Sequence, residues 1–264
     1  MITQLHNRAL IKVSGLDSEP FLQSQFSNDI NSISNNKVQI NAYCQHQGKI
    51  IAIIWVFKRA NSFYLSLPID LKEVVLSKLT MFKMMSKVKI EDYSETINQF
   101  GLVGESRDNS FKITENLSLV TTREMISNSN QFSEWEYACI KDKLPEVYAN
   151  YSETFIPQAL NLDINLLGVS FTKGCYPGQE IVARMHYLGN PKRRLFRFTS
   201  KFEVCIGDYL NVNGSKSLKS SGQVVRATKK DSEFQFLGVF EVSYINDKIF
   251  LNNDQLKLVN LIHE

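Results

Sequence analysis

The stretch KVQINAYCQHQGKIIAIIWVF, residues 37–57, decides the first part of the fold. Two apolar runs, residues 37–44 and 49–57, are separated by the four residues QHQG. Short runs rich in Ile and Val are typical of strands, and a glycine in a short connection is typical of a hairpin. The stretch therefore predicts an antiparallel hairpin that turns at residues 45–48.

Shorter patterns on both sides of this hairpin predict two helices and three more strands. Asp17 and Pro20 mark the start of the first helix. The predicted elements are a strand at residues 10–13, a helix with apolar positions Leu22, Phe26 and Ile30, a strand at 63–67, a helix with apolar positions Leu71, Val75 and Leu79, and a strand at 87–90. This order of elements favours a split β-α-β, ferredoxin-like sheet.

The rest of the chain divides into two further parts. Strand-like runs return over residues 99–122, and residues 132–140 have a helical pattern. Beyond residue 191 helical periodicity ends, and short β runs separated by Gly, Asn and Asp predict an antiparallel β-barrel. We therefore expect an α+β protein of three parts, residues 1–95, 96–190 and 191–264.

Composition excludes several classes of protein. The 264 residues carry a formal net charge of +3 and 22% charged side chains, which is ordinary for a globular chain and too mild to indicate nucleic-acid binding by bulk charge. The longest apolar run, residues 50–57, is far shorter than the roughly 20 residues that span a bilayer. Without a signal-peptide pattern at the start, a cytoplasmic protein is expected.

The four cysteines predict free thiols rather than disulfides or a metal site. Cys44, Cys139, Cys175 and Cys205 lie far apart, with no CxxC pair and no histidine at a zinc spacing. We expect no metal ligands among them, and we expect Cys44, Cys139 and Cys205 to be packing residues.

One segment carries candidate chemistry: FTKGCYPGQE, residues 171–180. A nearby ammonium lowers the pKa of a thiol, so Lys173 favours a reactive Cys175. Gln179 and Glu180 supply an amide and a carboxylate, the groups that pair with a heterocycle such as a pterin. A second interpretation stays open at this point, because Gly174 and Gly178 also suit a plain turn around an inert, buried thiol.

The motif KGCYPGQE with the following IVAR closely resembles the signature of the YgfZ family, folate-binding proteins related to the aminomethyltransferase of the glycine cleavage system. The resemblance extends to FIPQA at residues 155–159, GVSF at 168–171, and FLQSQ at 21–25 with Asn28 and Asp29. It implies three subdomains in a ring around a central opening, with tetrahydrofolate bound there near the signature cysteine. It also implies an accessory role for iron-sulfur enzymes, including those that thiolate tRNA, so the implied partners are iron-sulfur client or assembly proteins.

Matched by position, Trp135 corresponds to a folate-contacting aromatic residue of the family, and an indole can stack on the pterin. Its neighbours in the predicted helix allow simple packing as the alternative. A second family tryptophan is replaced here by Arg8, whose guanidinium can stack on a ring or pair with the glutamate tail of folate. Arg184 is expected to add positive field near Cys175 or to hold an anionic group.

A departure from the aminomethyltransferases argues against the same reaction. Those enzymes carry an acidic pair on the strand after the hairpin glycine, and the matching residues here are Ala52 and Ile53. Without that carboxylate the chain lacks the expected group for proton transfer at the folate nitrogen. A folate-dependent one-carbon transferase therefore stays as the alternative function, and whether the chain is an enzyme stays open.

The second alternative is a tRNA-binding module. Residues 181–202 hold six basic and no acidic side chains, which suits phosphate contacts or the polyglutamate tail of folate. The other interpretation is a solvated barrel edge whose charges prevent aggregation. Alanine at Arg193 and Arg194 is the substitution that would distinguish the two.

Overall fold

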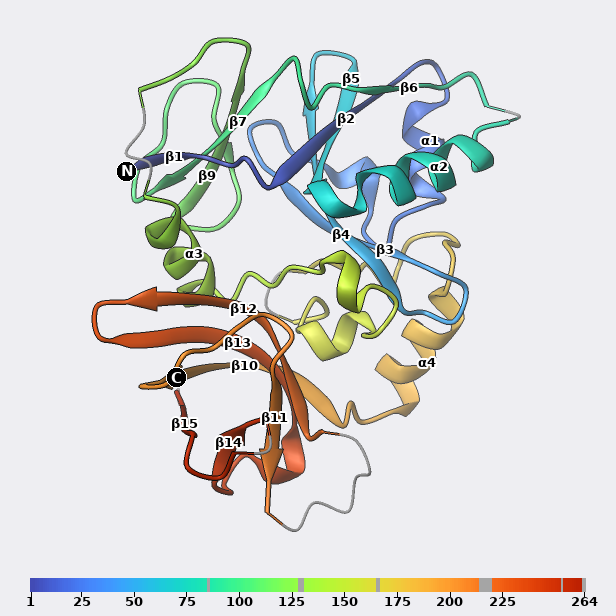
Figure 1. Ribbon diagram of the computed structural model, residues 1–264. Coiled ribbons are helices and arrows are strands. Elements are labelled where there is room, and N and C mark those ends of the chain that lie inside the picture. The colour runs from blue at the N-terminus through green and yellow to red at the C-terminus, as the bar shows by residue number, and fades with distance from the viewer. Residues whose placement is uncertain (85, 128–130, 165–166, 214–219, 253, 263–264) are drawn as a thin grey trace.

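The computed structural model describes residues 1–264 except 85, 128–130, 165–166, 214–219, 253 and 263–264. A five-stranded antiparallel sheet forms the first part of the molecule (Figure 1). Its strands follow the spatial order β3 (Gln39–Cys44), β4 (Ile50–Arg59), β5 (Ser62–Pro68), β2 (Arg8–Ser14) and β6 (Lys89–Asp92). The predicted hairpin is confirmed, because β3 and β4 pair directly and Gly48 takes φ +76° in the turn.

The split β-α-β order is also confirmed. β5 lies between β4 and β2, and the helices α1 (Ser18–Gln23) and α2 (Lys72–Phe82) fall in the connections that follow β2 and β5. This is the strand order of a ferredoxin-like sheet with β3 added at one edge.

The first predicted helix is too long. α1 ends at Gln23, although the predicted apolar stripe continued through Phe26 to Ile30. After α1 the chain turns onto the sheet, where Phe26 forms a bridge with Tyr43, and Ile30 begins a 3₁₀ turn. Leu22, Phe26 and Ile30 are all buried. Their four-residue spacing therefore predicted the buried side chains correctly but overestimated the length of the helix.

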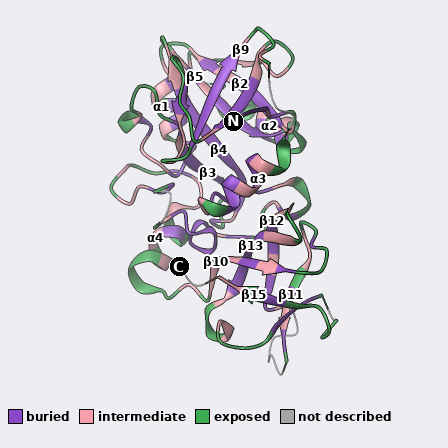
Figure 2. Cartoon of the chain, turned by 90° about the vertical axis from the view of Figure 1, so that its left-hand side faces the viewer, coloured by how far each residue is buried: buried purple, intermediate pink, exposed green. Residues whose placement is uncertain are grey.

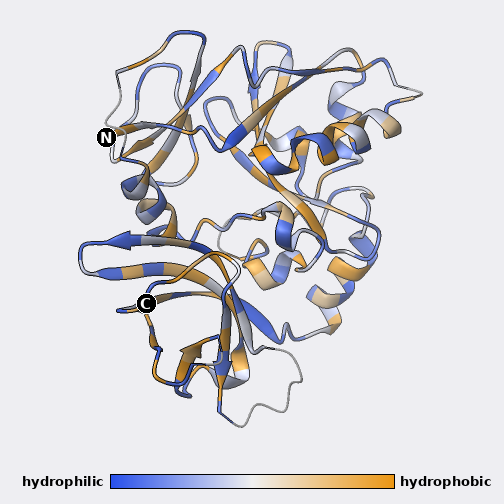
Figure 3. Ribbon diagram, viewed as in Figure 1, coloured by the Kyte–Doolittle hydropathy of each residue, from blue (hydrophilic) through white to orange (hydrophobic). Residues whose placement is uncertain are grey.

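β4 forms the centre of this core. Its first eight residues are buried, and Figure 3 draws it mainly in the hydrophobic colour. Figure 2 shows the same sheet largely in the colour of buried residues. Ala52 and Ile53 are both fully buried in this strand, so the positions of the missing acidic pair are sealed from solvent.

A second, four-stranded antiparallel sheet has the order β1 (Ile2–Gln4), β7 (Asn98–Val103), β9 (Leu117–Thr122) and β8 (Phe111–Lys112). The first residues of the chain therefore pair with β7 and not with the first sheet. Helix α3 (Phe132–Lys141) follows this sheet and contacts both β7 and β12.

The C-terminal part is a closed antiparallel barrel, as predicted. Its strands follow the order β10 (Arg193–Ser200), β13 (Glu233–Glu241), β12 (Gly222–Lys230), β11 (Tyr209–Val212), β14 (Ile249–Leu251) and β15 (Leu258–Leu261). Helix α4 (Gln179–Leu188) precedes it. Further 3₁₀ turns lie at Ile69–Leu71, Ala149–Tyr151, Pro157–Leu160 and Val242–Tyr244. No helix in the described part of the chain is long and apolar enough to cross a membrane.

Candidate functional site

The signature loop, residues 171–180, rests on the β3–β4 turn through two glycines. Gly178 has φ +83°, and a Cβ placed there would lie 2.6 Å from the Cα of Gly48 and 2.5 Å from the carbonyl oxygen of Gln45. Backbone therefore meets backbone at a distance that no side chain allows. The hairpin glycine and the second signature glycine form one contact.

Lys173 anchors the other end of this loop. Its Nζ donates to the carbonyl oxygens of Gln23 at 2.5 Å, Phe26 at 2.5 Å and Asn28 at 3.0 Å. Burial lowers the pKa of Lys173 to about 8, opposed by the charge of Asp29. Because three carbonyls engage the three donors of the ammonium, Lys173 ties the loop to the segment after α1. Its expected effect on the Cys175 thiol stays a prediction.

Cys175 lies on the open side of the anchored loop. It is exposed, and a Cβ placed at the neighbouring Gly174 would have no atom within 4 Å. The next residue, Tyr176, is buried, so the chain turns into the core directly after the thiol. The interpretation of Cys175 as a buried thiol is therefore wrong.

The other three cysteines separate into two kinds. Cys44 and Cys139 are buried as expected; burial raises the pKa of Cys44 to about 12 and also raises that of Cys139. Cys205 is exposed, so its assignment to packing was wrong. Cys205 is consequently a natural control for any experiment on the Cys175 thiol.

The predicted residues of α4 lie at its start and on its outer side. Gln179 is the first residue of the helix and donates through Nε2 to the carbonyl of Lys173 at 3.4 Å. Glu180 and Arg184 are exposed. Gln158, from the FIPQA segment, contacts the helix: its Nε2 donates a hydrogen bond to the carbonyl oxygen of Val182 at 2.7 Å.

Trp135 is a core residue. Its side chain is only 2% exposed, and its ring lies so close to Gly101 that a Cβ there would be 2.4 Å away. It also packs edge-on against Trp55, with ring centroids 6.4 Å apart. The packing role, which the sequence left open, is the one the structure displays.

The Arg8 side chain is also buried and engaged by contacts within the protein. Its guanidinium lies 3.5 Å above the Trp55 ring, its Nε donates to Ser66 Oγ at 2.8 Å, and its Nη1 pairs with the carboxylate of Glu146. Glu146 also approaches Arg226 at 3.8 Å, and Arg226 binds both carboxylate oxygens of Glu136.

We call Arg8, Glu136, Glu146 and Arg226 the buried ion cluster; burial raises the pKa of Glu136, and Arg226 opposes that shift. The five residues predicted to bind folate thus fall into two groups. Arg8 and Trp135 are in or beside this cluster, whereas Gln179, Glu180 and Arg184 are on α4. In both views α3, which carries Trp135, and α4 lie on different sides of the molecule (Figures 1 and 2). The structure does not bring the five together around one cavity.

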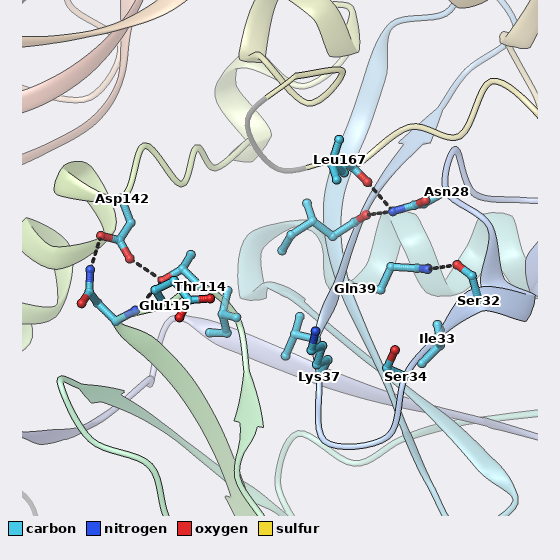
Figure 4. Close-up of a pocket in the computed structure, with 14 residues that line it drawn as sticks. Asn28, Ser32, Ile33, Ser34, Lys37, Gln39, Thr114, Glu115, Asp142 and Leu167 are labelled. Atoms are coloured by element: carbon cyan, nitrogen blue, oxygen red, sulfur yellow. Dashed lines mark hydrogen bonds between the residues drawn. The ribbon is translucent and has the colours of Figure 1, made fainter. Parts of the chain in front are cut away.

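A cleft of about 510 Å³ opens beside Asn28, where segments from different parts of the chain meet (Figure 4). Asn28 Nδ2 donates to the carbonyls of Ile40 at 3.0 Å and Leu167 at 2.6 Å. Opposite, Asp142 accepts hydrogen bonds from Thr114 and from Asn116. The cleft is lined by Asn28, Ser32, Ile33, Ser34, Lys37, Val38, Gln39, Ile40, Ile113, Thr114, Glu115, Asn116, Asp142 and Leu167.

Sequence reasoning missed almost all of this cleft. Asn28 alone was singled out, as part of the resemblance. Lys37 and Gln39 stand at the start of a predicted strand, and the β8–β9 turn and Asp142 follow weaker patterns. No spacing in the sequence signals that these segments meet.

Several of the basic side chains in residues 181–202 form contacts within the protein. Arg193 donates to the carbonyl of Ser220 and pairs with Glu241, and Arg194 pairs with Asp163 at 2.6 Å. Arg197 donates to Gln235. Alanine at Arg193 and Arg194 would therefore remove internal contacts, so it is a poor test of RNA binding.

The whole chain adopts the fold of an aminomethyltransferase-type protein. Glycine cleavage system aminomethyltransferase T from Bartonella henselae superposes on 100% of this chain and 84% of its own, with a TM-score of 0.70 at 11% identity. That likeness concerns the fold alone. No family model matches the sequence.

Sequence relatives are closer. A tRNA-modifying protein YgfZ from Vibrio atlanticus is 30% identical over 223 residues, covering 74% of this chain and 68% of the relative. The YgfZ protein of Colwellia psychrerythraea is 29% identical over 236 residues, covering 76% and 72%. An uncharacterized protein from Haemophilus influenzae is 30% identical over 264 residues, covering 95% and 90%. The chain belongs to the YgfZ family.

Proposed function

We propose that this chain is a cytosolic accessory protein for tRNA modification that presents the Cys175 thiol to iron-sulfur enzymes, including those that thiolate tRNA. The names of the YgfZ relatives support the link to tRNA modification. The observation that carries the proposal is an exposed cysteine on a loop fixed at both ends, by Lys173 and by the Gly178–Gly48 contact.

A rigid frame around an exposed thiol suits presentation to a partner. The thiol needs no reorganisation of its loop to be reached, and preorganised groups lose less entropy when they engage. One cysteine does not hold an iron-sulfur cluster, which normally takes four ligands. Among the described residues there is no group of three or more His, Cys, Asp or Glu arranged to bind a metal. A cluster held with Cys175 would take its other ligands from a partner or from small molecules.

The resemblance also implies that the chain binds tetrahydrofolate. We propose a different binding site from the one that the sequence predicts. The buried Trp135 and the engaged Arg8 offer no free ring or cation. The cleft beside Asn28 has suitable donors and acceptors: amides and the carboxylates of Glu115 and Asp142 for the edge of a pterin, apolar walls for its faces, and the exposed Lys37 ammonium for a carboxylate tail. When bound, a tetrahydrofolate supplies a reduced pterin able to carry one-carbon units.

Asn28 connects the cleft with the thiol loop. Its side chain lines the cleft, and its backbone carbonyl accepts from the Lys173 ammonium. A ligand in the cleft would thus stabilise the segment on which the signature loop is anchored.

No observation favours the one-carbon transferase. Ala52 and Ile53 are sealed in the core, so no carboxylate takes the place of the missing acidic pair on that strand.

The thiol is tested in bacteria that lack their own YgfZ gene. Cells carrying this chain, Cys175→Ala or Cys205→Ala are compared by mass spectrometry of thiolated tRNA nucleosides. We expect Cys175→Ala to lose complementation and Cys205→Ala, which also removes an exposed thiol, to retain it. Full complementation by Cys175→Ala would refute the role of the thiol.

The folate site is tested by calorimetric titration with tetrahydrofolate. Lys37→Ala is expected to weaken binding about tenfold by removing one charge-assisted contact. Lys201→Ala, an exposed lysine on the barrel, is the control. Equal affinity of the two variants for tetrahydrofolate would show that the ligand does not bind in this cleft.

A further inference from the structure

A second cleft lies beside the last turn of α4, on a side of the helix that the proposed thiol and folate sites do not use. It measures about 330 Å³. Phe155 and Ala159 in its wall are buried. It is lined by Thr154, Phe155, Ile156, Ala159, Met185, Asn190, Pro191, Lys192 and Arg193. Apolar walls of this size accept one flat heterocycle.

The edge of this cleft is positive. Lys192 is exposed, and its ammonium has no described hydrogen bond or ion pair within the described residues. Arg193 adds a second guanidinium, although Glu241 and the carbonyl of Ser220 already engage it. No acidic residue occurs among the described residues that line the cleft. A flat ring that carries a negative group beside it matches this combination.

Aromatic side chains also occupy the last turn of α4, on the side that faces Phe171 of the signature loop. His186 stacks on Phe171, with ring centroids 3.7 Å apart and an interplanar angle of 14°. Tyr187 stands edge-on to His186 at 4.8 Å and is 66% exposed. Exposed rings beside free cations are the arrangement with which proteins bind unpaired nucleotides, because bases stack on rings and phosphates contact ammonium groups.

Much of the surface of α4 is exposed. Val182 is its one buried residue among the described positions, and Arg184 and Leu188 are also exposed. The segment 171–188 therefore carries the signature thiol near its start and an exposed aromatic and basic surface at its end.

We infer that this cleft binds an unpaired nucleotide of an RNA strand. The base enters between Phe155, Met185 and Pro191, its phosphate contacts Lys192, and the strand continues around the end of α4, where another base stacks on Tyr187. The inference rests on the proposed function, which it deepens by assigning RNA itself as a partner of the same helix. Single-stranded segments are expected to bind and duplexes are not, since a paired base cannot enter the cleft.

The test is fluorescence anisotropy with a fluorescein-labelled ten-nucleotide oligoadenylate. Lys192→Ala is expected to weaken binding about tenfold and to reduce the salt dependence by about one phosphate contact. Tyr187→Ala is expected to weaken it about tenfold through lost stacking. Both side chains are exposed, so both variants should fold, and Lys201→Ala is the matched lysine control.

Three results would overturn the inference. They are no saturable binding by the wild-type chain, equal affinity of Lys192→Ala, Tyr187→Ala and the control, and competition by an RNA duplex as effective as by the single strand. An apolar aromatic dye that stays in the cleft at saturating oligoadenylate would show that the strand does not enter it, which also overturns the inference.

The complementation assay separates this inference from the proposed function. If Cys175→Ala fails to complement while Lys192→Ala and Tyr187→Ala complement fully, the thiol role stands and RNA docking at the cleft falls. If Lys192→Ala binds RNA poorly but Cys175→Ala complements, the thiol role falls and the RNA site stands.

Discussion

The buried ion cluster and the signature loop use charged side chains in opposite ways. In the cluster, Arg8 and Arg226 face Glu136 and Glu146 away from water, and each side chain is at least nine-tenths buried. In the loop, the Lys173 ammonium donates hydrogen bonds to backbone carbonyls, and the nearby Cys175 is exposed. The difference shows that the cluster pairs its charges inside the core, whereas the loop keeps one thiol accessible to solvent.

Removing one member of the cluster should have the largest effect. Glu146→Ala leaves Arg8 without its carboxylate and removes the neighbour of Arg226, so two buried cations lose compensation. We expect a loss of about 3–5 kcal/mol in the free energy of unfolding, measured by urea denaturation. Glu134→Ala breaks the partly exposed pair with Lys230 and should cost at most about 1 kcal/mol. Similar losses in the two variants would contradict the comparison.

The two signature glycines should differ sharply. Gly178→Ala forces a side chain into a left-handed backbone and against Gly48, so we expect a loss of about 1–3 kcal/mol and loosening of the loop. Gly174→Ala meets open space and should change stability by less than about 0.5 kcal/mol. Urea denaturation measures the stability, and proteolysis near residue 175 reports the loop. A destabilising Gly174→Ala would show that the loop is constrained on both sides.

The anchor should make stability depend on pH. Burial lowers the pKa of Lys173 to about 8, below the value of 10.5 of a free lysine. Between these values the unfolded chain binds more protons than the folded one, so the contribution of Lys173 to stability rises with pH from about 8 to 10.5. Below pH 8 both states are charged, and the burial cost is fully present.

The measurement is the difference in unfolding free energy between the wild type and Lys173→Met across this range. We expect the unfolding free energy of the wild type to increase relative to that of the variant as pH rises from about 8 to 10.5. A flat or falling difference would mean that the three carbonyl contacts keep the ammonium charged to its ordinary pKa.

The smallest effect on stability is expected at the thiol itself. Cys175→Ala should change the free energy of unfolding by less than about 0.5 kcal/mol, because the side chain is exposed. Alkylation of the native protein with iodoacetamide, followed by mass spectrometry, should modify Cys175 and Cys205 and spare Cys44 and Cys139 until the chain unfolds. Protection of Cys175 in the native protein would place the loop against other parts of the chain.

Local sequence patterns predicted the elements whose structure depends on neighbours along the chain. The hairpin followed from Gly48, the barrel from short β runs, and the second helix from Leu71, Val75 and Leu79. The first helix failed, because burial of Phe26 and Ile30 against the sheet produces the same spacing as a helical stripe. The lysine, cysteine and glycines of the signature segment led to the family resemblance, and the exposure of Cys175 then came from the structure.

The sequence by itself determined the order of strands and helices along the first part of the chain, the short β runs of the barrel and the family signature, because each depends on residues close together in the chain. Tertiary structure alone decided that Trp135 and Arg8 are buried, that Lys173 binds carbonyls and that the cleft beside Asn28 exists. Those features depend on contacts between residues far apart in the chain, and the free energy of such contacts is set by burial and geometry, which no local spacing records.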